Sequence, residues 1–129
     1  MIARGMFEVK MTPHSPQGES TSEPFQRLTG DKQFHGELEG TGKGEMLGVY
    51  TAVEGSGAYV ALEVVTGELD GKRGSFILQH KGTMRKGVYM MEVTVVPDSG
   101  TEALAGISGK MKIIIEGTKH SYEFEYSFE

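Results

Sequence analysis

The 129-residue sequence contains no cysteine, which excludes disulfide bonds, a thiol nucleophile and zinc sites of the cysteine type. It has no apolar run near the roughly 20 residues that a membrane-spanning helix needs. The opening residues MIARGMFEVK contain no apolar segment of signal-peptide length, so we expect a cytoplasmic protein with no membrane partner. The 13 lysines and arginines are spread along a chain of net charge −5, which argues against nucleic acid as a partner.

Familiar catalytic and metal-binding motifs are also missing. Gly42-Lys43 is followed by Gly44 rather than by serine or threonine, which fails the P-loop pattern, and no serine lies in G-x-S-x-G. The four histidines show no H-x-H or H-E-x-x-H spacing, so we expect no metal and no cofactor. Covalent catalysis is therefore poorly supported, and whether the protein is an enzyme stays open.

Long segments without helix-breaking residues are scarce. Before the C-terminal segment 118–129, no stretch free of glycine and proline exceeds nine residues, whereas a mean helix has about 11–12. In that segment, TKHSYEFEYSFE, aromatic residues occupy every second position from Tyr122 to Phe128, which is typical of a strand with one apolar face. The same period recurs in four other segments, for example at Phe76, Leu78 and His80.

Turn-forming residues separate the alternating segments. They occur at EGSG (54–57), DGKR (70–73), MRKG (84–87) and EGTK (116–119), and Asp70-Gly71 is a favoured two-residue hairpin turn. We expect PQGESTSEP (16–24) to be a longer loop and GTGKG (40–44) to be a bend or turn. The sequence thus predicts one all-β domain, 1–129, with eight strands near 3–14, 26–39, 44–53, 58–68, 74–82, 87–96, 104–116 and 119–128. Such strands close most simply as an antiparallel barrel, and a two-sheet sandwich is the alternative.

A short repeat connects two of these segments. GELEG (36–40) reappears as GELDG (67–71), 31 residues later. A duplicated hairpin explains the repeat, and so does the recurrent use of glycine where a barrel strand bends.

Four segments of the second half carry a resemblance to known proteins: GSFILQH, VVPDSGT, LAGISG and HSYEFEY. The chain resembles a family of small bacterial proteins that is described as a domain of unknown function and has an allene oxide cyclase-like barrel. The segment from Gly100 to Gly109 also resembles a strand-turn-strand pattern of allene oxide cyclases and dirigent proteins, with Glu102 in place of its middle glycine. This resemblance implies an eight-stranded antiparallel barrel that is often oligomeric, and it implies no reaction.

His80 is the leading candidate for a functional side chain, because it continues the inward face that Phe76 and Leu78 begin. A buried imidazole needs a hydrogen-bond partner, which Glu63 on the preceding strand could supply. Further candidates are three tyrosine hydroxyls and two apolar side chains that could line a pocket: Tyr50, Tyr122, Tyr126, Phe76 and Met91.

The strand AYVALEVV (58–65) is apolar on both faces. Val60, Leu62 and Val64 form the more apolar face, which favours an outward-pointing Glu63. A barrel strand with an apolar outer face needs a cover, and a second copy of the chain would provide one. We therefore expect a homo-oligomer, and Val88 and Met90 on a later strand support that expectation.

The leading interpretation is a small barrel that binds a small, largely apolar ligand in its interior. One alternative is an isomerase- or cyclase-like enzyme that uses the same cavity, and another is an oligomeric structural protein with a filled barrel. The volume of the interior distinguishes these interpretations, because a packed barrel has no room for a ligand.

Overall fold

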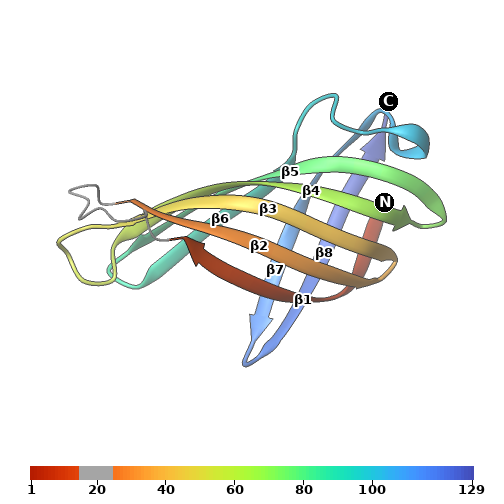
Figure 1. Ribbon diagram of the computed structural model, residues 1–129. Helices are drawn as coiled ribbons and strands as arrows, with labels where there is room; N and C mark the ends of the chain where they lie inside the picture. The colour runs from red at the N-terminus through yellow and green to blue at the C-terminus, as the bar shows by residue number, and fades with distance from the viewer. Residues whose placement is uncertain (15–24) are drawn as a thin grey trace.

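The computed structural model describes residues 1–14 and 25–129, which form a closed eight-stranded barrel (Figure 1). Each strand pairs antiparallel with the next, and the last strand pairs with the first. The predicted barrel is confirmed, and the sandwich alternative is wrong. The elements are β1 Ile2–His14, β2 Phe25–Gly36, β3 Leu38–Tyr50, β4 Gly57–Leu69, β5 Lys72–Arg85, β6 Val88–Val95, the 3₁₀ helix η1 Glu102–Leu104, β7 Ile107–Glu116 and β8 Lys119–Phe128.

Tight turns join the strands where the sequence predicts them. Asp70 and Gly71 connect β4 to β5 with φ values of 48° and 82°, and Lys86 and Gly87 connect β5 to β6 with 48° and 87°. Two successive positive φ values match the twist of a two-residue hairpin, which is why glycine stands second in both turns. The loop predicted at 16–24 lies outside the described residues.

Several strand boundaries differ from the prediction by about three residues or more, and two of these differences have a clear structural reason. The segment 40–44 is not a turn, because β3 runs straight through it, and the chain reverses instead at Gly36 and Glu37. The glycines of this segment alternate along β3 and share its inward face. They provide space inside the barrel rather than a bend. β7 begins at Ile107 rather than at residue 104, because η1 occupies the residues before it.

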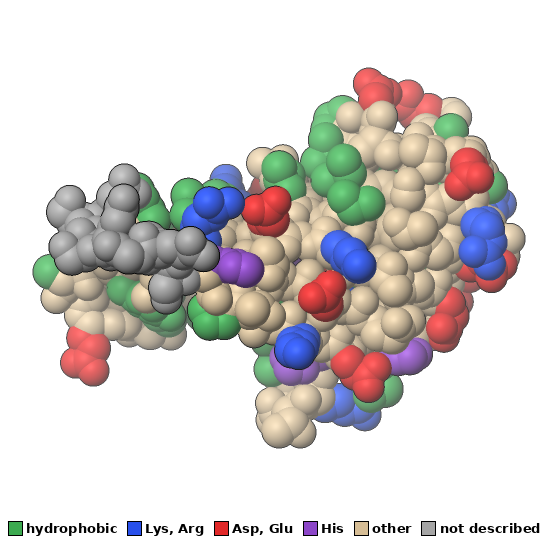
Figure 2. All heavy atoms as spheres, viewed as in Figure 1, with side chains coloured by type: hydrophobic (Ala, Val, Ile, Leu, Met, Phe, Trp, Pro, Cys, Tyr) green, Lys and Arg blue, Asp and Glu red, His purple; other side chains and the backbone are tan. Residues whose placement is uncertain are grey.

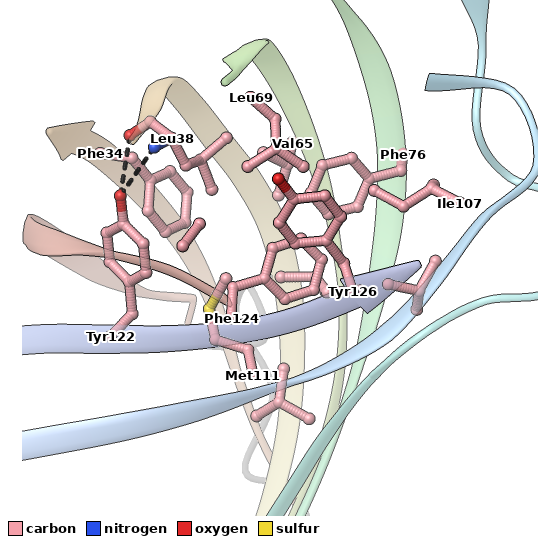
Figure 3. Close-up of a cluster of buried hydrophobic side chains, with 14 of the residues drawn as sticks. Phe34, Leu38, Val65, Leu69, Phe76, Ile107, Met111, Tyr122, Phe124 and Tyr126 are labelled. Atoms are coloured by element: carbon pink, nitrogen blue, oxygen red, sulfur yellow. Dashed lines mark hydrogen bonds between the residues drawn. The ribbon is translucent and has the colours of Figure 1, made fainter. Parts of the chain in front are cut away.

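One end of the barrel is filled by apolar side chains (Figure 3). Phe76 stacks on Phe124 with ring centroids 5.5 Å apart, and Phe124 stacks on Tyr126 at 5.4 Å. Leu104 of η1 is buried against β5 at Gly74, where a side chain would overlap the Thr101 carbonyl oxygen. This closed end carries most of the buried apolar surface, which is the main source of stability for the fold.

The repeated segments 36–40 and 67–71 are neighbours in this closed end. Leu38 pairs with Leu69 and Gly40 with Gly67, so the two segments face each other across the β3–β4 ladder. Both leucines are fully buried. A Cβ atom on either glycine would overlap the opposite backbone, so the close approach of the two strands requires glycine at both positions.

The two strand seams beside the β7–β8 hairpin are paired over part of their length. β1 pairs with β8 from Ile2 to Phe7, and β6 pairs with β7 at Thr94 and Lys110. Beyond these pairs, the β7–β8 hairpin diverges from the β5–β6 hairpin, as Figure 1 shows. The barrel is therefore closed at one end and opens toward the other.

Candidate functional site

Three charged or ionisable side chains meet inside the barrel, where the filled end gives way to the open end. Lys32 of β2, Glu63 of β4 and His80 of β5 all point inward, and their side chains are 15%, 6% and 10% exposed. His80 donates its Nε2–H to Glu63 Oε1 at 2.7 Å, and Lys32 Nζ donates to the same oxygen at 3.2 Å. We call this group the Lys32–Glu63–His80 cluster.

The surroundings of the cluster keep Glu63 ionised. Burial alone raises the pKa of Glu63, but the hydrogen bond from His80 and the charge of Lys32 outweigh it, so the pKa lies below its ordinary value of 4.5. Lys32 Nζ also lies 4.9 Å from the ring centroid of Phe7 and 5.7 Å from that of Phe34. These rings stabilise the ammonium group through cation–π contact. The cluster is therefore a buried carboxylate held by two donors.

The expectation that Glu63 points outward is wrong. The more apolar face of β4, with Val60, Leu62 and Val64, is the outer one, and these side chains are exposed. Glu63 turns inward because β3 leaves room for it, since a Cβ atom on Gly42 would overlap Glu63 Oε2. The hairpin register gives the same answer: the Asp70-Gly71 turn pairs Glu63 with Leu78, so both share one face.

A cavity of about 320 Å³ lies in the open half of the barrel, directly beside this cluster. Most of its lining is apolar or bare backbone, contributed by Phe7, Val9, Met11, Gly30, Gly44, Met46, Ala61, Met91, Ile113 and Ile115. The lining residues with polar side chains are fewer, and they include Tyr59, Tyr89 and His120. Burial raises the pKa of Tyr59 above 10.0, and the neighbouring Tyr89 raises it further. Tyr59 therefore stays a neutral hydrogen-bonding group.

His80 lines this cavity, and one of its ring nitrogens has no hydrogen-bond partner among the described residues. Glu63 Oε2 is the one buried side-chain polar atom that lacks a hydrogen-bond partner within residues 1–14 and 25–129. His80 Nδ1 has no partner in that part of the chain either, so it is not fully buried, and His80 lines the cavity. In the neutral imidazole that donates through Nε2, Nδ1 carries the lone pair and accepts hydrogen bonds.

The structure brings together three of the candidates from the sequence. His80, Glu63 and Met91 line the cavity. Phe76 is buried in the closed end, and Tyr50 is exposed at the end of β3 in the open half, where it does not line this cavity.

The two remaining tyrosines belong to the closed end rather than to the cavity. The Tyr122 hydroxyl accepts a hydrogen bond from the Leu38 N–H at 3.0 Å, and it contacts the carbonyl oxygens of His35 and Leu38. Tyr126 donates to Asp70, and burial together with that carboxylate raises the pKa of Tyr126 to about 12. Both hydroxyls therefore stabilise the closed end through hydrogen bonds, and neither of them contacts His80.

Sequence reasoning missed Lys32, Tyr59, Tyr89 and His120. Lys32 stands two residues before Phe34 in β2 and so shares its inward face, but a lysine between polar neighbours gives no sign of burial. Tyr59 lies opposite Gly82, and its ring fills the space that a side chain there would take. This pairing of a large residue with a glycine was a signal that alternation alone does not use.

The described residues contain no group of three or more histidine, aspartate or glutamate side chains that could hold a metal ion. Over the same residues, no helix is long and apolar enough to cross a membrane.

The fold and the site define a small closed antiparallel barrel with an apolar cavity and a buried ionic cluster. The chain belongs to the family described as "Protein of unknown function (DUF3224)", which matches residues 3–126. It is similar to the crystal structure of a DUF3224 family protein of unknown function from Shewanella oneidensis MR-1, with 44% sequence identity and a TM-score of 0.91. That similarity covers 100% of this chain and 98% of the other. No curated protein matches the sequence. The predicted membership in a domain-of-unknown-function family is confirmed.

Proposed function

We propose that the open half of the barrel binds one small, largely apolar ligand that carries a hydrogen-bond donor. The observation that supports this proposal is the cavity of about 320 Å³ with His80 on its wall. Its volume is near the lower end of the roughly 300–1,000 Å³ range of ligand sites. An apolar lining with a few fixed polar groups is the usual composition of such sites. A barrel filled throughout by side chains would leave no such space.

The donor on the ligand follows from the hydrogen bond between His80 and Glu63. Because Glu63 accepts from Nε2, a neutral His80 offers Nδ1 to the cavity as an acceptor. A hydroxyl or N–H group on the ligand would satisfy it. The Tyr59 and Tyr89 hydroxyls would provide further polar contacts at the cavity wall.

A second candidate function is proton transfer by an isomerase-like enzyme, favoured by the hydrogen bond between His80 and Glu63. A carboxylate on one ring nitrogen supports a histidine that takes up a proton on the other. Lys32 binds the same carboxylate oxygen, however, and so offsets part of the negative charge that would stabilise an imidazolium. We therefore place ligand binding before catalysis.

A matched pair of fluorescent probes tests the ligand proposal. 2-Naphthol carries a hydroxyl donor, and 2-methoxynaphthalene has the same ring system without a donor. One net hydrogen bond of about 0.5–1.5 kcal/mol predicts about a twofold to twelvefold preference of the wild-type protein for 2-naphthol. His80→Leu should abolish that preference, whereas His35→Ala, outside the cavity, should retain it.

Three results would contradict the proposal: no binding of either probe, equal binding of both by the wild type, or an unchanged preference in His80→Leu. Ala61→Phe adds a check on the location of the site, because Ala61 lines the cavity and a phenyl ring would fill part of it. This variant should bind both probes more weakly while its circular dichroism spectrum stays that of the wild type. The cytoplasmic location stays a prediction, which cell fractionation can test.

A further inference from the structure

β6 is an edge strand over most of its length. It pairs with β5 from Val88 to Val95. On its other side, the part of the chain that the structure describes pairs with it at Thr94 alone. The backbone groups between Val88 and Val93 that face away from β5 therefore form an open sheet edge. Such an edge is a template for pairing with another strand.

The same stretch is apolar on both faces. Val88, Tyr89, Met90 and Met91 are 68%, 58%, 71% and 40% exposed. Natural edge strands are usually protected by lysine, proline or a bulge, and this stretch contains no lysine or proline. An uncovered apolar edge of this kind favours association.

We propose that β6 pairs antiparallel with β6 of a second copy of the chain, across a two-fold axis at Tyr89. In this register Val88 lies opposite Met90 of the second copy, so the exposed apolar side chains on the outer face cover each other. β6 begins at Val88, so Glu92 of the second copy extends past the paired residues toward the Lys86-Gly87 turn, and opposite charges approach each other at both ends of the interface. The stretch is thus complementary to itself in apolar character and in charge, as a two-fold interface requires.

The interface also completes the cavity. Tyr89 and Met91 on the inward face of β6 line the cavity, at the side where β6 and β7 no longer pair. A second β6 strand at this seam covers that side and brings Tyr89 of the second copy beside Tyr89 of the first. Two cavities therefore share one boundary in the dimer.

The outer face of β4 is the competing surface. Hydrophobic side chains gather over β4 and β5 in Figure 2, and Val60, Leu62 and Val64 contribute to a shallow groove there. The backbone of β4 is already paired on both sides, with β3 and β5. That face therefore lacks the open hydrogen-bonding groups that make β6 the better template.

Single cysteine variants can locate the interface, because the natural chain contains no cysteine. Mild oxidation should convert Tyr89→Cys into a disulfide-linked dimer, since the two copies of residue 89 face each other. Met90→Cys, which lies diagonally from its own copy, should crosslink less, and Leu62→Cys on β4 should stay monomeric on a non-reducing gel. Light scattering of the wild-type protein at micromolar concentration should give twice the chain mass of 14.0 kDa.

A charge on the edge gives an independent test. Met90→Lys should shift the protein to a monomer, whereas Leu62→Lys should leave the dimer intact, with both variants folded by circular dichroism. The proposal is overturned if the wild-type protein is monomeric, if Leu62→Cys crosslinks and Tyr89→Cys does not, or if a dimer forms in which neither variant crosslinks.

Discussion

A single methyl group on the wall of β3 should displace the buried carboxylate. Gly42 of β3 and Glu63 of the neighbouring strand β4 share the inner face of the barrel, and a Cβ atom on Gly42 would overlap Glu63 Oε2 and lie 3.0 Å from both Glu63 Cδ and Phe34 Cε2. Ordinary contact begins near 3.4 Å, so in Gly42→Ala the carboxylate must move away from its two donors, His80 and Lys32.

The size of the effect follows from three contributions. Overpacking of a core typically costs about 1–3 kcal/mol. Weakening hydrogen bonds to a charged group adds about 1.5–3 kcal/mol. Alanine has fewer conformations than glycine in the unfolded chain, which stabilises the folded protein by about 0.4–1 kcal/mol. We expect Gly42→Ala to lower the free energy of unfolding by about 2–4 kcal/mol, or roughly 7–15 °C in Tm for a chain of this length.

Gly48→Ala is the matched control, because Gly48 lies on the same inward face of β3. A Cβ atom there would lie 3.5 Å from its nearest neighbours, which is ordinary contact. This variant should be unchanged or more stable than the wild type by up to about 1 kcal/mol. Both variants can be compared by thermal unfolding followed by circular dichroism.

The double variant Gly42→Ala/Glu63→Ala tests the cause. Without the carboxylate, the methyl group has space, so Gly42→Ala should cost at least about 1 kcal/mol less in the Glu63→Ala background. The reasoning is refuted if Gly42→Ala lies within about 0.5 kcal/mol of the wild type, a typical value for harmless substitutions. Equal costs of Gly42→Ala in both backgrounds would refute it as well.

Two further predictions concern the buried polar groups. Because the folded-state pKa of Glu63 lies below 4.5, its contribution to stability is present above pH 4.5 and is lost on acidification through the folded pKa. Urea unfolding should therefore show that the free energy of unfolding falls less steeply below pH 4.5 in Glu63→Gln than in the wild type. Equal dependence of this free energy on pH in the two proteins would contradict the prediction. Tyr122→Phe removes the acceptor of the buried Leu38 N–H and should cost about 1–3 kcal/mol in the same assay, whereas a neutral effect would show that water or another group replaces the hydroxyl.

The fold could be predicted because strands that bury one face repeat apolar residues with a period of two. The segment Tyr122–Phe128 shows this period without exception, and Asp70-Gly71 specifies a turn by its own backbone preferences. The segment 40–44 was read incorrectly because glycine serves two purposes that look identical in a sequence. It allows a turn, and it also leaves space on a strand. Only the neighbours of each glycine in the barrel distinguish the two.

The candidate site could be predicted in part. His80 was found because it continues an apolar inward face, and Glu63 was recognised as its possible partner. The direction of Glu63 could not be predicted because β4 is apolar on both faces. The more apolar face is the outer one, so hydrophobicity alone indicates the wrong orientation for Glu63. Lys32 could not be found, since its burial depends on two contacts across the barrel, with Glu63 and with the ring of Phe7.

If the barrel binds a ligand as proposed, the bare backbone at Gly30 and Gly44 limits the size of the molecule that the cavity can hold. These two glycines are paired across β2 and β3, and both border the cavity. A methyl group at Gly44 would meet the Leu62 carbonyl oxygen at 2.7 Å, whereas one at Gly30 would meet only the flexible side chain of Met11 at 3.0 Å. The barrel therefore has no space for a side chain at Gly44, whereas a small side chain at Gly30 requires only a shift of Met11. Single substitutions at residue 30 could narrow the range of accepted molecules while the closed end continues to hold the fold.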